Sequence, residues 1–286
     1  KKKKKKIVLI RLLNHLLTNN LLTDRQHGFL AGRSTITALT DLVEHIIDNI
    51  ERKNTVTSTF LDLSKAFDCL DHQLVMAKIS SLGIKETALL WFKSYLGERK
   101  QVVTIQQTTN GVTKTTTSSP LAITRGVPQG SVLGPVLFIL FTCDLPDYIN
   151  SYCYPVMYAD DTVLTTSDKS TELLEINTFI SINMAHQYCI ENDLVFNKSK
   201  TQHVIFGRNK DQVTIPADTQ ISHSTKHLGL ILDDCLSWNI HIDSLCSQLC
   251  AALFALRRIK LISTPEATKV VYHALFESRI RYGIIL

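Results

Sequence analysis

The sequence predicts an α+β protein built on an antiparallel sheet. Predicted strands and helices follow one another without the regular βαβ rhythm of a parallel sheet. Residues 101–117 are rich in Thr and Val and carry an Asn-Gly pair, which is typical of a β-hairpin. Residues 156–164, VMYADDTVL, place two residues between short β-prone runs, which indicates a second hairpin. The 286 residues, 44% of them hydrophobic, suffice for one large domain or two small ones.

Apolar residues at helical spacing predict most of the remaining elements. We expect helices over residues 7–23, 35–52, 72–82, 85–96, 132–143 and 170–191, and again from about residue 238. Further strands are expected at 59–61, 194–196, 202–206 and 228–232. Asp71 and Ser131 are the expected N-caps of the helices that follow them. Within 170–191, the residues expected to share one face are Leu173, Ile176, Ile180, Met184 and Tyr188.

The positive charge of the chain is concentrated at its start. The formal net charge is +5, but the first six residues are lysines, and without them 25 Lys and Arg stand against 26 Asp and Glu. A nucleic-acid-binding groove therefore requires local clustering of basic residues. No apolar run reaches the roughly 18 residues of a membrane span, no cleavable signal is recognisable, and the seven cysteines form no CxxC pair. We expect an intracellular protein that is not secreted.

Adjacent carboxylates interrupt the second predicted hairpin. Asp160 and Asp161 fall at its tip, where a solvated turn is the alternative to a functional pair. Asp62 directly follows the predicted strand 59–61, and if the two elements are neighbours, three carboxylates meet at one end of the sheet. Carboxylates suit hard divalent ions such as Mg²⁺. Two such ions about 3.5–4 Å apart form the site for phosphoryl transfer.

Six segments, taken together, resemble the reverse transcriptases, most closely the non-LTR (LINE-type) retrotransposon group. FLDLSKAFDCLDH, RGVPQGSVLGPVLF and MYADDTVL, in this order, resemble motifs A, B and C. NKSKTQHVIFG is similar to motif D, HLGLILDDCLSW to motif E, and NNLLTDRQHGFLAGRSTITAL to the fingers segment before motif A. The resemblance implies a right-hand polymerase fold, with an antiparallel palm sheet, partial fingers and a partial thumb. Fingers and palm would span residues 7–236, and the thumb would begin in 237–286.

The resemblance also implies the roles of individual residues. Asp62, Asp160 and Asp161 would bind two Mg²⁺ ions, with Mn²⁺ as a substitute, and Asp161 would have the weaker or indirect role. The backbone of Leu63 and Ser64 would lie along the incoming triphosphate.

Three further residues match positions that contact the nucleotide in the family. Phe67 stands where an aromatic ring excludes the ribose 2′-hydroxyl, although a core aromatic is the alternative. Gln129 would contact the nucleotide and the template. Lys200 would lie near the leaving pyrophosphate as a proton donor, although a lone lysine in a turn is more often solvated.

The implied activity is RNA-directed DNA synthesis. The partners would be an RNA template, a DNA primer and dNTPs, without a membrane, in the nucleus or in a cytoplasmic ribonucleoprotein. An Arg-Pro-Ile type segment of the fingers is missing, and GFL replaces the usual GFR at 28–30, so we expect a fragment. An inactive remnant that at most binds nucleic acid is the first alternative. An RNA-templated RNA polymerase is another, and Phe67 argues against it.

Overall fold

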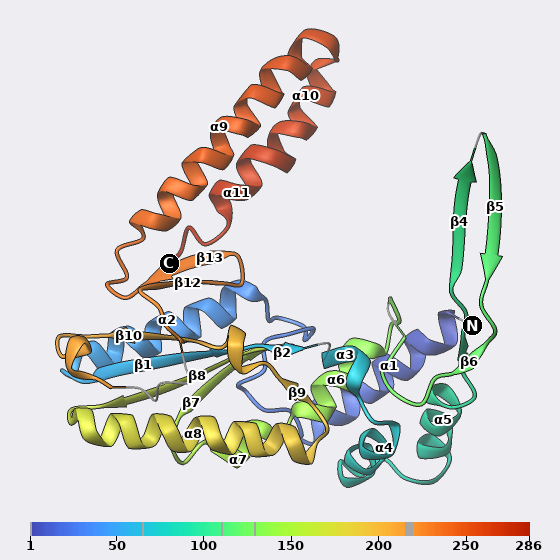
Figure 1. The fold of residues 1–286 in the computed structure, drawn as a ribbon, viewed down its shortest axis with the longest axis horizontal. Coiled ribbons are helices and arrows are strands. Elements are labelled where there is room, and N and C mark those ends of the chain that lie inside the picture. The colour runs from blue at the N-terminus through green and yellow to red at the C-terminus, as the bar shows by residue number, and fades with distance from the viewer. Residues whose placement is uncertain (1, 65, 110, 129, 215–219) are drawn as a thin grey trace. The chain divides into compact units, whose positions relative to one another are not determined.

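The computed structural model describes residues 2–64, 66–109, 111–128, 130–214 and 220–286 (Figure 1). The chain forms two compact units. Unit 1 consists of Lys1–Asp24, Leu63–Leu145 and His186–Phe196. Unit 2 consists of Arg25–Asp62, Pro146–Ala185 and Asn197–Leu286. The domain boundary expected near residue 236 stays a prediction.

Unit 2 is built on a five-stranded sheet with the strand order β11-β10-β1-β8-β7 (Figure 1). Its strands are β1 (Thr55–Leu61), β7 (Tyr154–Tyr158), β8 (Asp161–Asp168), β10 (Gln202–Phe206) and β11 (Gln220–Ile221). All neighbouring strands are antiparallel except β10 and β11, which are parallel. The prediction of an α+β fold with an antiparallel sheet is confirmed.

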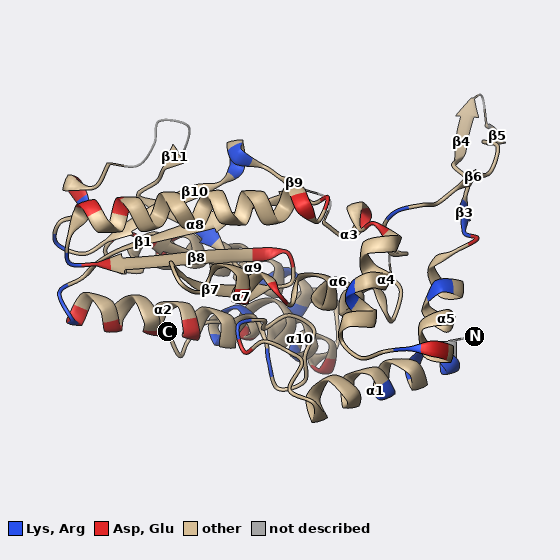
Figure 2. Ribbon diagram, turned by 90° about the horizontal axis from the view of Figure 1, so that it is seen from below, with Lys and Arg blue, Asp and Glu red and all other residues tan. Residues whose placement is uncertain are grey.

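Helices α2 (Thr35–Glu51) and α8 (Thr171–Glu191) lie on opposite faces of this sheet (Figure 2). Alternating side chains of each strand face each helix, because successive residues of a strand point to opposite sides. On the α2 side, Val56 and Phe60 of β1 pack with apolar residues of α2. Ser34 caps α2 in a capping box with Thr37. This helix was predicted within one residue of its observed end.

The buried face of α8 differs from the predicted one. Leu173 and Ile176 are about half exposed, whereas Leu174, Thr178 and Ala185 are buried. The Thr178 and Thr166 hydroxyls lie 2.7 Å apart, so α8 meets β8 through a hydroxyl contact. The apolar pattern misled because apolar residues occur all around this helix, and small or hydroxyl-bearing residues occupy the side that approaches the sheet.

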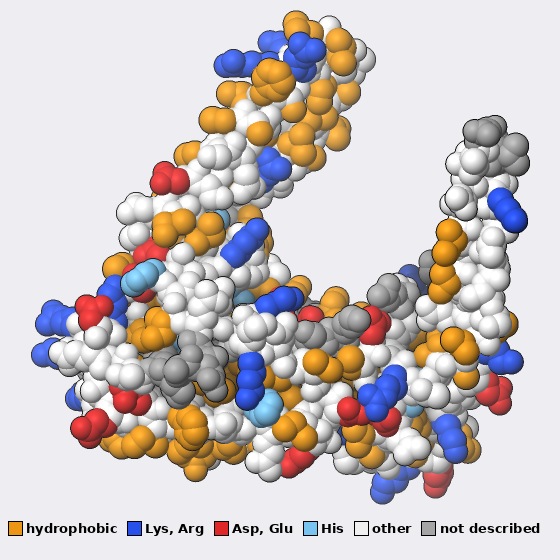
Figure 3. All heavy atoms as spheres, in the orientation of Figure 1, with side chains coloured by type: hydrophobic (Ala, Val, Ile, Leu, Met, Phe, Trp, Pro, Cys, Tyr) orange, Lys and Arg blue, Asp and Glu red, His pale blue; other side chains and the backbone are white. Residues whose placement is uncertain are grey.

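The C-terminal part of unit 2 is a β-hairpin followed by helices. The hairpin strands are β12 (Ser224–His227) and β13 (Leu230–Asp233), and the helical segments are α9 (Asn239–Ile262), α10 (Pro265–Tyr272), a π-helical turn (His273–Glu277) and α11 (Ser278–Arg281). Ala252 and Leu256 are the residues of α9 that are buried. Hydrophobic side chains lie exposed over α9 and α10 (Figure 3), among them Phe254, Leu261 and Val270. The helices predicted from residue 238 onward are confirmed.

Unit 1 is mainly helical and has small two-stranded sheets. Its helices are α1 (Lys2–Thr18), α3 (Ala66–Cys69), α4 (His72–Ser81), α5 (Glu86–Leu96) and α6 (Gly134–Thr142). The paired strands are β2 (Leu63–Ser64) with β9 (Val195–Phe196), β3 (Lys100–Gln101) with β6 (Leu121–Ala122), and β4 (Thr104–Thr109) with β5 (Val112–Thr117). The predicted Thr-rich hairpin is confirmed, since Thr109 pairs with Val112 across residues 110–111.

The two predicted helix caps of unit 1 have different outcomes. The Asp71 side chain accepts the N–H groups of Gln73 and Leu74, which confirms it as the N-cap of α4. Ser131 is not the N-cap of α6, because that helix begins later, at Gly134. The Ser131 hydroxyl instead accepts the Gly134 N–H at 2.9 Å, so it still satisfies a free donor of the first turn.

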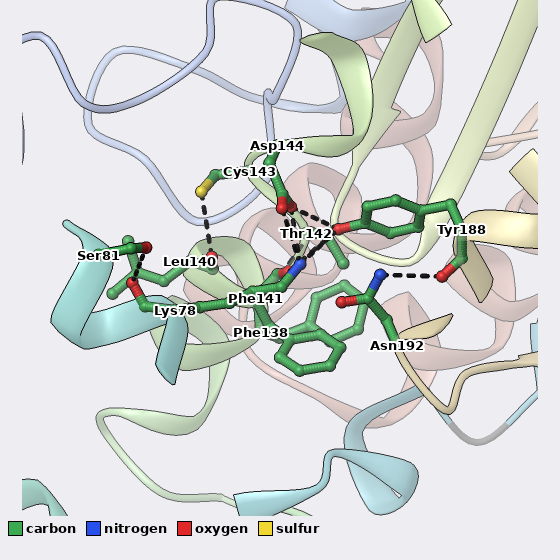
Figure 4. Close-up of polar contacts among 10 residues, drawn as sticks. All are labelled: Lys78, Ser81, Phe138, Leu140, Phe141, Thr142, Cys143, Asp144, Tyr188 and Asn192. Atoms are coloured by element: carbon green, nitrogen blue, oxygen red, sulfur yellow. Dashed lines mark hydrogen bonds and ion pairs between the residues drawn. The ribbon is translucent and has the colours of Figure 1, made fainter. Parts of the chain in front are cut away.

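A polar network lies at the C-terminal end of α6 (Figure 4). Lys78 Nζ of α4 donates to the Phe141 carbonyl and to Asp144, both at 2.7 Å, and to the Tyr188 hydroxyl at 2.8 Å. The Tyr188 hydroxyl donates to Asp144 at 2.5 Å. Burial lowers the pKa of Lys78, against the raising effect of Asp144. These contacts join α4, the C-terminal end of α6 and the last turns of α8, which belong to unit 1 from His186 onward, and leave each of these polar groups with a partner.

All seven cysteines are free thiols. No helix in the described ranges is both long and apolar enough to cross a membrane.

Candidate active site

The adjacent aspartates stand at a tight turn of unit 2. Tyr158 of β7 pairs with Asp161 of β8, so the two-residue loop is Ala159–Asp160, one residue earlier than the predicted Asp160–Asp161. Ala159 has φ +57°, a left-handed conformation that a residue with a Cβ adopts at a cost. Asp161 is the first residue of β8. The turn thus carries both carboxylates at one end of the sheet.

Asp62 comes to the same end of the sheet from the central strand. Leu61, the last residue of β1, pairs with Thr162. Asp62, which follows β1, therefore lies across from Asp161. This register confirms that β1 is a neighbour of the hairpin, the condition under which three carboxylates were expected to meet. Because β1 and β8 are antiparallel, the C-terminal end of β1 and the N-terminal start of β8 lie at the same end of the sheet.

The electrostatics at this end of the sheet disfavour three ionised carboxylates without a cation. Burial raises the pKa of the Asp160 carboxyl, and the Asp62 carboxylate raises it further. Burial also raises the pKa of Asp161, as do the charges of Asp160 and Asp62. Like charges in one partly buried place repel, and a bound cation would remove this penalty. This end of the sheet is therefore better suited to carboxylates with a cation than to carboxylates alone.

An unpartnered oxygen supports the same interpretation. Asp62 Oδ2 is inaccessible to solvent and accepts no hydrogen bond from any residue that the structure describes. The ammonium group of Lys200 is 3.7 Å from this oxygen, an ion pair too long to be a hydrogen bond. Buried carboxylate oxygens normally have a donor or a cation. The donor set of Asp62, Asp160 and Asp161 thus fits a hard divalent ion.

The carboxylates are nevertheless more widely spaced than in a preformed metal cage. In the described part of the chain, the group of ligand atoms within 4.8 Å of one another is formed by Asp233, Asp234 and Cys235. The three predicted aspartates do not meet that spacing. Closer approach of their oxygens would accompany binding of an ion, because their mutual repulsion acts until a cation neutralises it.

The Asp233–Cys235 group itself is occupied by contacts within the protein. Asp233 accepts the N–H groups of Cys235, Ser237 and Trp238 at 3.0–3.1 Å. Asp234 pairs with Lys210 at 3.0 Å and with His223. We did not predict this cluster, although its Asp-Asp pair was visible in the segment assigned to motif E. Its carboxylates already have partners, so it has a structural role.

Lys200 lies where its predicted role would need it. It closes a short 3₁₀ turn, Lys198–Lys200, directly before β10, and its side chain is mostly exposed. β10 is the other neighbour of β1 and is antiparallel to it, with Gln202 paired to Phe60. The turn before β10 therefore lies at the same end of the sheet as Asp62. The structure brings Lys200 and Asp62 together, while the role of Lys200 as a proton donor stays a prediction.

The remaining predicted residues belong to unit 1. Leu63 and Ser64 form β2, which pairs with β9. The Phe67 ring lies 4.7 Å from the ring of Phe138 in α6, centroid to centroid, and is half-buried. Gln129 lies outside the described residues. The roles expected for these residues stay predictions.

The loop before Gln129 lies directly beside the segment that carries Phe67. The Val127 N–H donates to the Phe67 carbonyl at 3.0 Å, and the Gly126 N–H donates to the Leu70 carbonyl at 2.8 Å. A Cβ on Gly126 would lie 2.7 Å from the carbonyl oxygen of Asp68. The glycine at this position thus allows a close approach to the backbone of the same chain.

A basic cavity adjoins this loop in unit 1. Its volume is about 660 Å³, and Arg99, Lys100, Arg125 and Asp68 contribute to its lining. Arg125 also forms an ion pair with Asp193. Arg33 belongs to unit 2 and donates to the Gln26 carbonyl at 2.7 Å. Basic residues thus gather around this cavity.

Comparison with known proteins gives consistent matches. The family profile described as reverse transcriptase (RNA-dependent DNA polymerase) matches residues 1–232. A probable RNA-directed DNA polymerase from transposon BS of Drosophila melanogaster is 28% identical, over 95% of this chain and 31% of that protein. The RNA-directed DNA polymerase from mobile element jockey of Drosophila funebris is 31% identical, over 82% of this chain and 26% of that protein. The chain thus spans about a third or less of these relatives.

A solved structure is similar in fold. The apo telomerase of Candida tropicalis, truncated from its C-terminal domain, matches with a TM-score of 0.55 and 13% identity. The match covers 82% of this chain and 44% of that one. At this identity the match supports the fold alone, and it agrees with the predicted right-hand polymerase architecture.

Proposed function

The chain belongs to the reverse transcriptase family, and from this premise we propose that it forms the polymerase core of a non-LTR retrotransposon protein. The proposed reaction is RNA-templated addition of a deoxynucleotide to a primer 3′-hydroxyl. The relatives that the chain matches are named as polymerases of mobile elements. The observation that carries the proposal is the register of β1 and β8, which places Asp62 level with Asp161 beside the Asp160 turn.

Reverse transcriptases generally use divalent metal ions, and we propose two Mg²⁺ ions here, with Mn²⁺ as a substitute. Asp62, Asp160 and Asp161 would hold them. When bound, such ions lower the pKa of the attacking hydroxyl and neutralise charge on the departing pyrophosphate. The protein contributes the strand ends that carry the three carboxylates to the same end of the sheet, so that small side-chain movements would suffice to bring their oxygens onto an ion.

Other residues would act on the nucleotide. The backbone of Leu63 and Ser64 would run along the triphosphate, and Gln129 would contact the base pair that forms. The Phe67 ring would collide with a ribose 2′-hydroxyl, which separates this proposal from an RNA polymerase. Lys200, already within 3.7 Å of Asp62, would donate a proton to the leaving pyrophosphate.

The proposed partners are an RNA template, a DNA primer and dNTPs. The basic cavity lined by Arg99, Lys100 and Arg125 supports a nucleic-acid partner, because phosphate contacts supply most of the affinity for nucleic acids. We propose an intracellular setting, the nucleus or a cytoplasmic ribonucleoprotein.

Primer extension on poly(rA)/oligo(dT) with Mg²⁺ and dTTP tests the function. We expect extension by the wild-type chain and none by Asp160→Ala. Asp48→Ala, which removes an exposed carboxylate from α2, is the matched control and should extend normally. Extension that survives in Asp160→Ala would contradict the proposal.

A nucleic-acid-binding protein without turnover is the second candidate. The wide spacing of the three carboxylates favours it, because they form no group of ligand atoms within 4.8 Å. Retained binding of the RNA–DNA duplex without extension, in wild type and Asp160→Ala alike, would support this candidate.

A further inference from the structure

A short segment of unit 2 lies alongside the end of β7, just before the Asp160 turn. Gln26 and Met157 form an isolated parallel bridge. The His27 N–H donates to the Met157 carbonyl at 2.7 Å, and the Met157 N–H donates to the Arg25 carbonyl at 2.9 Å. Through these bonds the segment pairs with β7 as a short additional strand would, next to the last residues before the turn. The segment Arg25–Gly28 is therefore tied to the acidic hairpin.

The side chain of Gln26 reaches the turn itself. Its Oε1 accepts the Ala159 N–H at 2.9 Å and the Gly28 N–H at 2.7 Å. Gln26 is 1% exposed, so water cannot replace these bonds. Two backbone donors on one atom identify that atom as the oxygen of the amide. The Nε2 of Gln26 is buried without a hydrogen-bond partner among the described residues, so the contacts of this side chain are made through its oxygen.

Ala159 is the residue of the turn that most needs external support. Its left-handed backbone is unfavourable for a residue with a Cβ, and such a conformation persists only where its surroundings hold it. Since Asp160 follows directly, the backbone conformation of Ala159 sets the direction in which Asp160 leaves the strand.

Gly28 lacks a side chain, and this allows its backbone to approach both Ala159 and the Gln26 side chain. A Cβ at this position would lie 2.5 Å from the Ala159 nitrogen and 2.9 Å from Gln26 Oε1. Gly28 is not among the glycines with positive φ, so its backbone conformation would allow a side chain. The lack of space is therefore what requires glycine at this position. The backbone of Gly28 therefore packs directly on the turn.

The segment is fixed from its other side by α2 and the loop before it. Arg33 donates to the Gln26 carbonyl at 2.7 Å. His27 contacts the Thr37 hydroxyl at 3.0 Å and Asp41 at 3.4 Å. A support that is itself held can fix a functional group, as in the outer shells of metal sites.

We propose that Gln26 and Gly28 are positioning residues, which hold the Ala159–Asp160 turn in the conformation that presents Asp160 and Asp161 to a divalent ion. The hold on the turn stands on the contacts above. The consequence for the ion rests on the proposed function, so the test measures the two separately.

The test uses three variants of the full chain. Gln26→Met keeps the length and removes the acceptor, whereas Gln26→Glu keeps an acceptor oxygen and is the rescue. Asn49→Leu is the matched control, because Asn49 is also a buried amide whose oxygen accepts two hydrogen bonds, from Asn54 and from Ser167, which lies far along β8 from Asp161. It removes comparable bonds without touching the turn.

The first measurement is hydrogen exchange of the Ala159 amide by NMR. We expect at least about tenfold faster exchange in Gln26→Met, because the amide loses its acceptor in a buried site, and protection near the wild-type level in Gln26→Glu and Asn49→Leu. The amide of Leu164 in the middle of β8 reports whether the sheet stays folded. Unchanged Ala159 exchange in a folded Gln26→Met would overturn the proposal.

The second measurement is Mn²⁺ binding, followed by the electron paramagnetic resonance of free Mn²⁺ without nucleic acid. We expect about tenfold weaker binding in Gln26→Met, the usual effect of losing an outer-shell support, and recovery in Gln26→Glu. Gly28→Ala provides a second variant, with the same expected loss through displacement of the turn. Weakening by Asn49→Leu to the same extent would mean that general destabilisation is the cause, and would overturn the positioning role.

The two proposals fail in different ways. Wild-type Mn²⁺ binding that is absent, or equal in Asp160→Ala, would contradict the metal site of the proposed function, and the exchange of Ala159 would still decide whether Gln26 holds the turn. Site-specific Mn²⁺ binding that Gln26→Met leaves intact would overturn the further inference alone.

Discussion

Two groups of charged residues in this protein are built on opposite principles. In unit 1, Lys78, Asp144 and Tyr188 satisfy one another and the end of α6, as Figure 4 shows. In unit 2, Asp62 keeps a buried oxygen without a donor, and burial and like charge raise the pKa of Asp160 and Asp161. In the first arrangement the cation hydrogen-bonds directly to its partners, whereas in the second the Lys200 ammonium stands 3.7 Å from Asp62 Oδ2, beyond hydrogen-bond distance, beside three carboxylates. A group with all its partners stabilises the fold; a group that lacks one is available to a ligand.

The largest effect that we expect from this contrast is on activity. Asp160→Asn should lower primer extension by at least about 100-fold, the size typical of losing one electrostatic contact in an active site. The same variant should unfold at an equal or higher denaturant concentration, because it removes one of three repelling charges. Extension assays and urea unfolding on one preparation check both. A variant with lower stability and normal extension would reverse the comparison.

The complementary substitution should affect stability. Lys78→Met removes the shared donor of the unit 1 network and should lower the free energy of unfolding by about 2–3 kcal/mol, the range for hydrogen bonds to charged groups. Urea unfolding checks this value, and Lys93→Met, at an exposed position of α5, is the matched control. Equal stability of the two variants would show that the network contributes nothing.

The core of unit 2 should make stability depend on pH. Burial lowers the pKa of His203 to about 4, whereas an unfolded histidine titrates near 6.5. The folded state therefore binds the proton less tightly, so this stabilisation is complete above pH 6.5 and is lost as the pH falls towards 4. At pH 5 the loss amounts to about 2 kcal/mol.

His203→Asn tests this dependence, because Asn can keep the contact of Nδ1 with the Thr59 hydroxyl, 2.9 Å in the wild type, without titrating. Unfolding measured from pH 7 to pH 5 should show a smaller slope in this variant. A wild-type slope in His203→Asn would refute the assignment.

The smallest of these effects concerns sugar selection. Phe67→Val should reduce the preference for dTTP over UTP by about tenfold, because steric selection of this kind is worth one to three kcal/mol. Competition of the two nucleotides in the extension assay measures it. Phe92→Val, a substitution of another buried ring of unit 1, serves as the control for general damage. Unchanged discrimination would leave Phe67 as a packing residue on Phe138.

The parts of the fold that were predicted correctly are those specified by neighbouring residues. The Asp71 cap, the two hairpins and helix α2 depend on short patterns, and each is confirmed. The buried face of α8 depends on which side meets the sheet, and the pattern of apolar residues did not contain that information. The prediction therefore failed at Leu173 and Ile176, which lie about half exposed.

The site divides in the same way. Asp62, Asp160 and Asp161 could be identified because each adjoins a recognisable strand or turn. The contact of Gln26 with Ala159 joins residues 133 positions apart, and a glutamine in a loop has no local feature that reveals it. The one available signal was the glycine at 28, whose neighbour across the fold cannot be read from the sequence.

The pairing of β1 also determines which changes of chain length the protein can absorb. A residue added after Asp168, or in the turn before Thr55, would alter a connection at the far end of the strands and leave the register intact. A residue deleted within β1 would invert its alternation, turn Val56 and Phe60 away from α2 and move Asp62 off the level of Asp161. We therefore expect the fold to tolerate insertions and deletions in the connections near Thr55 and Asp168, but not within β1, which leads to Asp62 at the opposite end of the sheet.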